Sequence, residues 1–131
     1  MPRFMLDTDS VSFALRGVGH VASRIVEHLP SELCMSAITV AELRYGADRR
    51  KSKKLHELID AFTNNIAVAP FDESCAASFG RIASELADRG APIGEFDALI
   101  AAHAVALRVT LVTNNVRHFA RIRGLKVENW L

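Results

Sequence analysis

Short runs of apolar residues recur along this chain and alternate with longer amphipathic stretches. The runs occupy residues 4–6, 33–35, 66–68 and 109–112, and residues 126–128 form a candidate edge strand. A run that is apolar at every position is typical of a strand buried on both faces, and strands separated by helices are typical of a parallel sheet. The sequence therefore predicts an α/β/α sandwich, in which a central parallel β-sheet is flanked by helices on both faces.

Helices are expected between these runs, because the apolar residues there recur at helical spacing. We place them at about residues 8–16, 21–29, 39–47, 55–62, 72–89 and 97–107. Thr39 is predicted to open the third helix and Asp72 to cap the fifth. The pattern leaves the order of the strands in the sheet open.

Length and charge limit the classes of protein that fit. The 131 residues suit one domain, spanning 1–131, and sixteen basic against fifteen acidic residues leave a net charge of +1. That balance excludes binding of nucleic acid through overall charge and leaves only local patches for it. Cys34 and Cys75 stand in apolar stretches and are expected to be buried free thiols. Without a signal peptide or an apolar run of membrane length, we expect a soluble, cytoplasmic protein that binds no membrane.

Carboxylates fall where the predicted strands and helices meet. Asp7 directly follows the first strand, Glu42 lies near the start of the helix after the second, and Asp97 lies near the start of the helix that precedes the strand at 109–112. Thr113 and Asn115 follow that last strand. Because the carboxyl ends of parallel strands share one edge of a sheet, we expect these side chains to converge there.

Each acid taken alone also has a structural explanation. Asp7 and Asp9 could cap the first helix, Glu42 could complete a capping box with Thr39, and Asp97 could complement a helix dipole. Together, however, three converging carboxylates repel one another unless a cation binds them. Oxygen donors without His or Cys favour a hard ion, Mg²⁺ or Mn²⁺, which also binds phosphate oxygens.

The connection at residues 90–94 is an obstacle to this convergence. Five residues span at most about 17 Å when extended, less than the length of the helix predicted before them. Either that helix lies across the sheet, or Asp97 lies at the opposite edge from Asp7 and Glu42.

Four sequence blocks, in order, resemble the PIN-domain ribonucleases, and most closely the VapC toxins of bacterial toxin–antitoxin pairs. The blocks are F-M-L-D-T-D, S-A-I-T-V-A-E-L-R-Y-G-A, P-I-G-E-F-D-A-L-I-A-A-H-A and L-V-T-N-N-V-R-H-F. The resemblance implies a single PIN domain and a Mg²⁺- or Mn²⁺-dependent endoribonuclease that inhibits translation and growth. It further implies a homodimer or higher assembly, a VapB-type antitoxin as partner, and transfer RNA as substrate, with initiator transfer RNA the target in the most similar branch.

The same resemblance assigns expected roles to particular residues. Asp7, Glu42 and Asp97 match the acidic triad of the family, with Asp7 and Asp97 as direct metal ligands. Asn115 stands where many PIN domains have a fourth acid, which argues against a tightly held second metal ion. Thr113 and Asn115 are expected to position water or substrate, and Asp9 adds negative charge beside the site.

Other polar and aromatic residues carry weaker expectations. A basic stretch is a candidate contact for RNA phosphates, although a solvated turn explains it equally well. That stretch contributes Arg44, Arg49, Arg50 and Lys51. We expect His103 to be a semi-buried histidine with satisfied hydrogen bonds rather than a catalytic base, and Tyr45 and Trp130 to pack in the core or at a dimer interface.

Three other functions fit parts of the sequence. The segment D-T-D-S-V at residues 7–11 is also the opening motif of haloacid dehalogenase-type phosphatases, where Asp7 would be the nucleophile and Asp9 the acid/base. The lysine and the adjacent acid pair of that family are absent. A receiver-like signalling module would need a further Asp after the third strand and a paired Lys. A catalytically silent PIN relative that only binds a partner is the third alternative.

Overall fold

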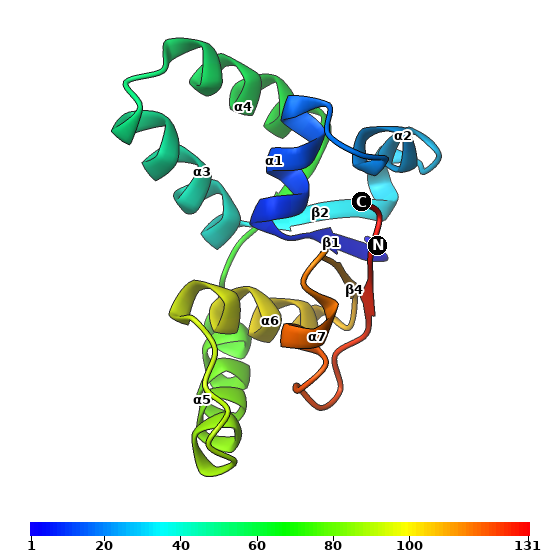
Figure 1. Ribbon diagram of the computed structural model, residues 1–131. Coiled ribbons are helices and arrows are strands. Elements are labelled where there is room, and N and C mark those ends of the chain that lie inside the picture. The colour runs from blue at the N-terminus through cyan, green and yellow to red at the C-terminus, as the bar shows by residue number, and fades with distance from the viewer.

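Five parallel strands form one sheet in the computed structural model, which describes residues 1–131 (Figure 1). The strands are β1 (Phe4–Leu6), β2 (Leu33–Ser36), β3 (Ala67–Ala69), β4 (Thr110–Val112) and β5 (Val127–Glu128). Their order is β3-β2-β1-β4-β5, and every neighbouring pair is parallel. In the centre, Met5 lies opposite Cys34 on one side and Leu111 on the other. The predicted parallel sheet is therefore confirmed.

Helices cover both faces of this sheet (Figure 1). They are α1 (Thr8–Arg16), α2 (Val21–Val26), α3 (Ala37–Arg49), α4 (Lys53–Asn65), α5 (Glu73–Asp88), α6 (Glu95–Leu107) and α7 (Val116–Phe119), with a short 3₁₀ turn, η1 (Pro30–Glu32). In Figure 1, α1 to α4 lie above the sheet and α5 to α7 below it. None of the helices combines the length and apolar character that crossing a bilayer requires.

Two apolar cores separate the sheet from its helices. Phe4 and Leu6 point into the core shared with α1 to α4, whereas Met5 points into the core shared with α5 to α7. This alternation is the two-residue period of a strand, and it explains why a run that is buried on both faces is apolar at every position. Cys34 and Cys75 are buried free thiols, as expected.

Some helix boundaries differ from those expected. α3 begins two residues earlier than predicted, because the Ser36 hydroxyl caps it by accepting the Ile38 N–H at 3.0 Å. Thr39 is buried inside the helix, so the predicted capping box between Thr39 and Glu42 is wrong. Asp72 caps α5 as predicted, accepting the Cys75 N–H at 3.2 Å.

The arrangement of α5 and α6 removes the obstacle raised by the short connection at residues 90–94. α5 packs across α6 and projects away from the sheet, so its end does not lie at the opposite edge (Figure 1). The connection then returns the chain to the carboxyl edge of the sheet, where α6 begins. Of the two alternatives, the helix at 72–89 lies across the neighbouring elements, and Asp97 starts on the same side as Asp7 and Glu42.

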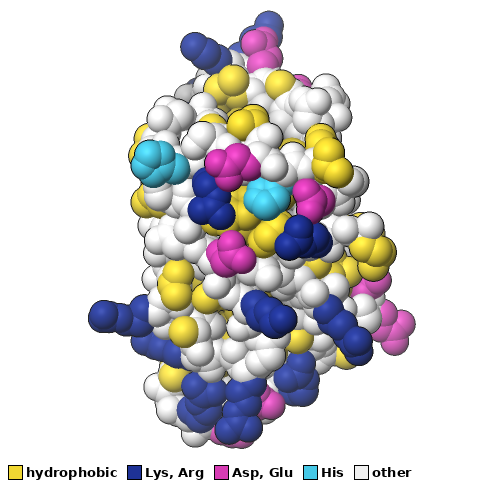
Figure 2. Space-filling view, turned by 90° about the vertical axis from the view of Figure 1, so that its right-hand side faces the viewer, with side chains coloured by type: hydrophobic (Ala, Val, Ile, Leu, Met, Phe, Trp, Pro, Cys, Tyr) yellow, Lys and Arg dark blue, Asp and Glu magenta, His cyan; other side chains and the backbone are white.

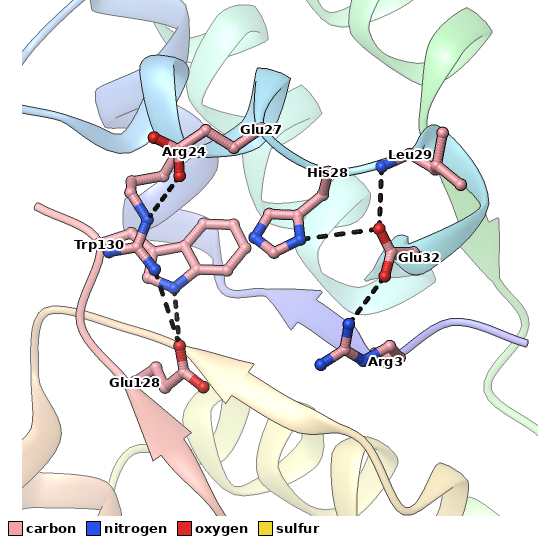
Figure 3. A network of polar contacts seen from close by, with 8 residues as sticks. All are labelled: Arg3, Arg24, Glu27, His28, Leu29, Glu32, Glu128 and Trp130. Atoms are coloured by element: carbon pink, nitrogen blue, oxygen red, sulfur yellow. Dashed lines mark hydrogen bonds and ion pairs between the residues drawn. The ribbon is translucent and has the colours of Figure 1, made fainter.

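A compact polar and aromatic network closes the opposite, amino edge of the sheet (Figure 3). The Trp130 ring is 2% exposed and stacks on His28 with ring centroids 4.9 Å apart. Its indole N–H donates to Glu128 at 3.0 Å, and Arg3 pairs with Glu32 at 2.8 Å. Trp130 is therefore a core residue, as favoured from the sequence.

Candidate active site

The candidate site lies at the carboxyl edge of the sheet, beside its central strand. β1 lies between β2 and β4, and the chain winds outward from β1 in one direction to β3 and later in the other to β5. Such a reversal of winding leaves a crevice at the strand ends, where α/β proteins place ligands. Asp7 follows β1 at this point, and its backbone N–H donates to the Val112 carbonyl at 3.0 Å.

Asp7 combines a structural and a chemical position. Its Oδ1 accepts the Ser10 N–H at 2.8 Å and so caps α1, while the Ser10 hydroxyl donates to the Val112 carbonyl at 3.0 Å. The carboxyl is 5% exposed, and burial raises its pKa, against the hydrogen bonds from Thr113 and Ser10 that lower it. The capping explanation from the sequence is therefore correct for Asp7.

Glu42 approaches the same edge from α3. Because α3 begins at Ala37, Glu42 lies in its second turn rather than its first. The Thr8 hydroxyl donates to Glu42 Oε1 at 2.6 Å, which ties α3 to the start of α1. Burial raises the pKa of Glu42, the Thr8 hydrogen bond opposes this, and repulsion from Asp97, Asp9 and Asp7 raises it further.

Asp97 approaches from the first turn of α6. Its Oδ2 lies 3.4 Å from His118 Nε2, on α7. Burial raises the pKa of Asp97, His118 lowers it, and the charge of Asp9 raises it again. The charges of Asp7 and Asp97 thus both raise the pKa of Glu42, and the charge of Asp9 raises the pKa of all three carboxyls.

The donor set suits a divalent cation in its chemistry. All three candidate ligands are carboxylates whose ionisation is opposed both by burial and by neighbouring acids, and a hard cation relieves both effects. No three His, Cys, Asp or Glu side chains form a ready-made metal cluster. Each carboxylate is instead held by a protein partner: Ser10 for Asp7, Thr8 for Glu42 and His118 for Asp97. A shared ion would require these side chains to rotate toward one another.

Comparison of the sequence with known protein families gives a match to the PIN domain over residues 4–125. The chain belongs to the PIN-domain family. It is 36% identical over 132 residues to the "tRNA(fMet)-specific endonuclease VapC" of Salmonella typhimurium, with 99% of each chain covered. It is 38% identical over 133 residues to "Ribonuclease VapC2" of Haemophilus influenzae, with all of each chain covered.

Solved structures agree with this assignment to the VapC branch of the PIN domains. The DNA-bound VapBC of Salmonella typhimurium matches all of this chain with a TM-score of 0.94 and 35% identity. VapBC2 of Rickettsia felis, bound to a promoter DNA fragment, matches 98% of each chain with a TM-score of 0.87 and 35% identity. The phosphatase and receiver-like interpretations of residues 7–11 are therefore replaced by a PIN domain, an endoribonuclease fold.

A polar cavity of about 200 Å³ adjoins the carboxylates of this PIN domain. Thr8, Asp9 and Glu42 line one part of it, and Arg16 and Arg50 line another. Acidic and basic groups thus face one space, as a site for a phosphate beside a cation requires. Of the predicted basic residues, Arg50 reaches this cavity, whereas Arg44 is bound by Asp60 and the His56 carbonyl within the α3–α4 pair. Arg49 and Lys51 are exposed and have no ion-pair partner.

Residues after β4 lie beside Asp7 at the carboxyl edge of the sheet. The Asn115 N–H donates to the Thr113 hydroxyl at 3.0 Å, and the Asn115 side chain does not cap α7. Thr113 is buried and Asn115 is exposed at the carboxyl edge. Their predicted roles with water or substrate stay predictions.

Sequence reasoning missed two contributors, Thr8 and His118. Thr8 directly follows Asp7, and a hydroxyl next to a strand-end acid is the signal that could have pointed to its contact with Glu42. His118 belongs to the block L-V-T-N-N-V-R-H-F, yet nothing in its spacing indicated that α7 faces the start of α6. Tyr45 is 69% exposed, so it does not pack in the core.

Proposed function

We propose that this PIN domain is the toxin of a toxin–antitoxin pair and that it hydrolyses RNA phosphodiester bonds with Mg²⁺ or Mn²⁺ bound at its carboxylates. The observation that carries the proposal is that Asp7 at the end of β1, Glu42 on α3 and Asp97 at the start of α6 lie at one edge of the sheet, where Asp7 and Asp97 both act on Glu42. Membership of a branch whose relatives are named ribonucleases and tRNA(fMet)-specific endonucleases supports it.

Asp7 and Asp97 would hold the cation, with Glu42 beside it. A bound divalent ion supplies positive charge that lowers the pKa of a water molecule and neutralises charge developing on the phosphate. Glu42, fixed by the Thr8 hydroxyl, is placed to accept the proton of the attacking water. The water oxygen bonds to phosphorus in line with the departing 3′ oxygen, which takes up a proton. The products are a 3′-hydroxyl and a 5′-phosphate.

Transfer RNA is the proposed substrate class, with initiator transfer RNA as the specific target. This proposal is supported by relatives at 35–36% identity over 99% of the chain that are named tRNA(fMet)-specific endonucleases. Arg16 and Arg50 line the cavity next to Glu42 and would bind phosphates of the RNA near the scissile bond.

A VapB-type antitoxin and a second copy of the chain are the proposed partners. Solved neighbours of this fold are VapBC complexes. Large apolar side chains are exposed in two places: Val26 and Leu29 around the end of α2, and Tyr45 and Phe96 around a cavity of about 300 Å³ next to Glu42. Grouped exposed apolar side chains are typical of surfaces that a partner covers. Assembly of two copies is testable by sedimentation of the purified chain.

The proposed activity is tested with purified protein and initiator transfer RNA. Wild-type protein should cleave with Mg²⁺, stop in excess chelator and recover when Mg²⁺ is restored. Asp7→Asn and Asp97→Asn should abolish cleavage while circular dichroism remains native, because Asn keeps the size and the capping ability of Asp. Asp88→Asn, an exposed acid at the end of α5, is the matched control and should cleave normally. Undiminished cleavage in chelator would refute the metal role.

The toxin role is tested by expression in bacteria. Wild-type protein should arrest growth, the Asp7→Asn variant should not, and co-expression of a VapB-type antitoxin that binds this chain should restore growth. Arrest by the Asp7→Asn variant would instead support the silent, partner-binding alternative.

A further inference from the structure

The C-terminal part of the chain carries a set of unpaired cations. No acidic residue occurs between Asp97 and Glu128, and five basic residues do. These residues, which we name the C-terminal basic surface, are Arg108, Arg117, Arg121, Arg123 and Lys126. All five are exposed, and none takes part in an ion pair, whereas Arg3, Arg24, Arg44 and Arg81 do. Since the whole chain has a net charge of +1, the rest of the molecule is net negative.

The backbone beneath this surface is fixed. Phe119 and Ile122 are buried in the core shared with α5 and α6, and Leu125 packs against it. β5 pairs with β4, and the Lys126 carbonyl accepts the Leu111 N–H at 2.8 Å. Apolar residues therefore anchor the segment while the basic residues between them remain exposed. The cations are held on a rigid framework rather than on a mobile tail.

One side of the molecule has mixed charges in one half and mainly basic side chains in the other. Figure 2 views the side on which both termini lie in Figure 1. Acidic, basic and histidine side chains are mixed in its upper half, and Lys and Arg side chains gather over its lower half. Charges beside the two termini are compensated: Glu32 binds Arg3, and Glu128 lies between Trp130 and Arg24 (Figure 3). Of the basic surface, only Arg123 lines a cavity with acids, Glu85 and Asp88.

Arg108 occupies a backbone conformation that an arginine rarely adopts. It ends α6 with φ +59°, in the left-handed region where glycine is favoured. That conformation costs a residue with a side chain roughly 1 kcal/mol or more relative to glycine. The chain thus keeps a long cation where the fold by itself favours glycine, which indicates a use for the cation.

The surface continues from the active site to the far edge of the sheet. Arg117 is next to His118, whose Nε2 lies 3.4 Å from Asp97. Arg108 follows Asp97 by eleven positions of one helix, so it lies about 16 Å farther along α6. An RNA strand that runs from the carboxylates toward Arg108 would pass several of these cations. A very short oligonucleotide bound at the carboxylates would not reach them all.

We propose that the C-terminal basic surface binds the phosphate backbone of folded RNA outside the cleavage site, so that the enzyme selects long structured substrates over short single strands. The proposal rests on the proposed function, because a ribonuclease gives such a surface its use. RNA is favoured over an acidic protein because the cations extend from Arg117, beside the proposed cleavage site, to Arg108 at the other end of α6. Phosphate contacts of this kind supply affinity that falls steeply with salt.

The test measures binding of labelled folded transfer RNA and of a short single-stranded oligonucleotide, in chelator, over a range of salt. The variant R121Q/K126Q removes two cations of the surface. The matched control K53Q/K54Q removes two exposed, unpaired cations at the start of α4. R121Q/K126Q should weaken transfer RNA binding at 0.1 M salt by roughly tenfold or more and lower the salt slope by about 1.5. The affinity of R121Q/K126Q for the oligonucleotide should change less than twofold. The affinities of K53Q/K54Q for transfer RNA and for the oligonucleotide should also change less than twofold.

A second variant separates binding from folding. R108G removes a cation and relieves the left-handed strain, so its melting temperature should stay the same or rise while transfer RNA binding weakens. Equal effects of R121Q/K126Q and K53Q/K54Q, or equal loss for both RNAs, would overturn the proposal. The proposal would also be overturned if R121Q/K126Q lost binding to the antitoxin but bound transfer RNA as the wild type does. Binding is measured in chelator, where no cleavage is expected, so it tests the basic surface alone. Mg²⁺-dependent cleavage of the oligonucleotide tests the proposed catalytic function separately, so failure of one proposal can be told from failure of the other.

Discussion

His103 on α6 lies 2.7 Å from Ser36 at the start of α3, measured from Nδ1 to the hydroxyl oxygen. The Ser36 oxygen also accepts the Ile38 N–H, so the same hydroxyl caps α3 and is hydrogen-bonded to the His103 ring. His103 is fully buried and its Nε2 has no hydrogen-bond partner, so the expectation of a semi-buried histidine with satisfied hydrogen bonds is wrong. Burial lowers the pKa of His103, which favours the neutral ring. Since α3 carries Glu42 and α6 carries Asp97, one buried hydrogen bond links the two helices that bear these carboxylates.

Because of this link, loss of the Ser36 cap should destabilise the protein more than loss of the Ser52 cap. Ser36→Ala should lower the free energy of unfolding by about 2–3 kcal/mol, because it removes the cap of α3 and leaves Nδ1 of His103 unpaired. Ser52→Ala removes only the cap of α4, where Ser52 accepts the Leu55 N–H at 3.0 Å, and should cost about 1 kcal/mol. Urea denaturation of both variants checks the difference, and equal losses would contradict the link.

Glu42 predicts a pH dependence of stability without metal. Its pKa in the folded protein is raised above the ordinary 4.5, so its contribution to stability is complete below pH 4.5 and is lost as the pH rises through the folded value. Glu42→Gln stays neutral and can still accept from Thr8. In chelator it should therefore unfold at higher urea than wild type at pH 7 and match it near pH 4. Glu57→Gln, an exposed acid on α4 without an ion-pair partner, is the control. A wild type as stable as Glu42→Gln at pH 7 would refute the prediction.

His118 is predicted to position Asp97 for catalysis. His118→Ala removes the only ion-pair partner of Asp97 and should lower the rate of RNA cleavage roughly 10–100-fold, as loss of a group that orients a metal ligand does. His118→Gln should recover part of this loss, because an amide can still donate to the carboxylate. His20→Ala alters an exposed histidine before α2 and should cleave normally. Cleavage of RNA by His118→Ala at the wild-type rate would rule out the role.

Substitution of Gly19 tests how tightly the C-terminal residue Leu131 packs against the turn before α2. Its φ is +65°, and an added Cβ would lie 2.8 Å from the Leu131 carbonyl oxygen, which accepts the His20 N–H. Gly17 has a similar φ of +67° with open space around it. Gly17→Ala should cost about 1–2 kcal/mol for backbone strain alone, and Gly19→Ala about 1–3 kcal/mol more for the clash. Thermal unfolding compares them, and indistinguishable melting temperatures would show that the C-terminus yields easily.

Strand positions were predictable to within a residue or two, because burial on both faces makes a strand apolar at every position. The run at 66–68 is displaced by one from β3, Ala67–Ala69, since β3 is an edge strand that is mostly exposed and has a weaker pattern. The start of α3 was predicted at Thr39 because Thr is a common cap. Ser36 takes that place because its hydroxyl faces both the Ile38 N–H and a buried histidine, and the second contact has no local signal.

The amino-acid sequence by itself determined a parallel sheet with helices on both faces, and it placed Asp7 and Glu42 at one edge of it. It could do so because hydrophobic periodicity and the position of a residue at a strand end are local properties of the chain. Only the tertiary structure decided that α5 crosses α6, that Asp97 therefore joins the other carboxylates, and that His118 faces it. These relations depend on how distant helices pack across shared apolar faces, and no local pattern of residues encodes that geometry.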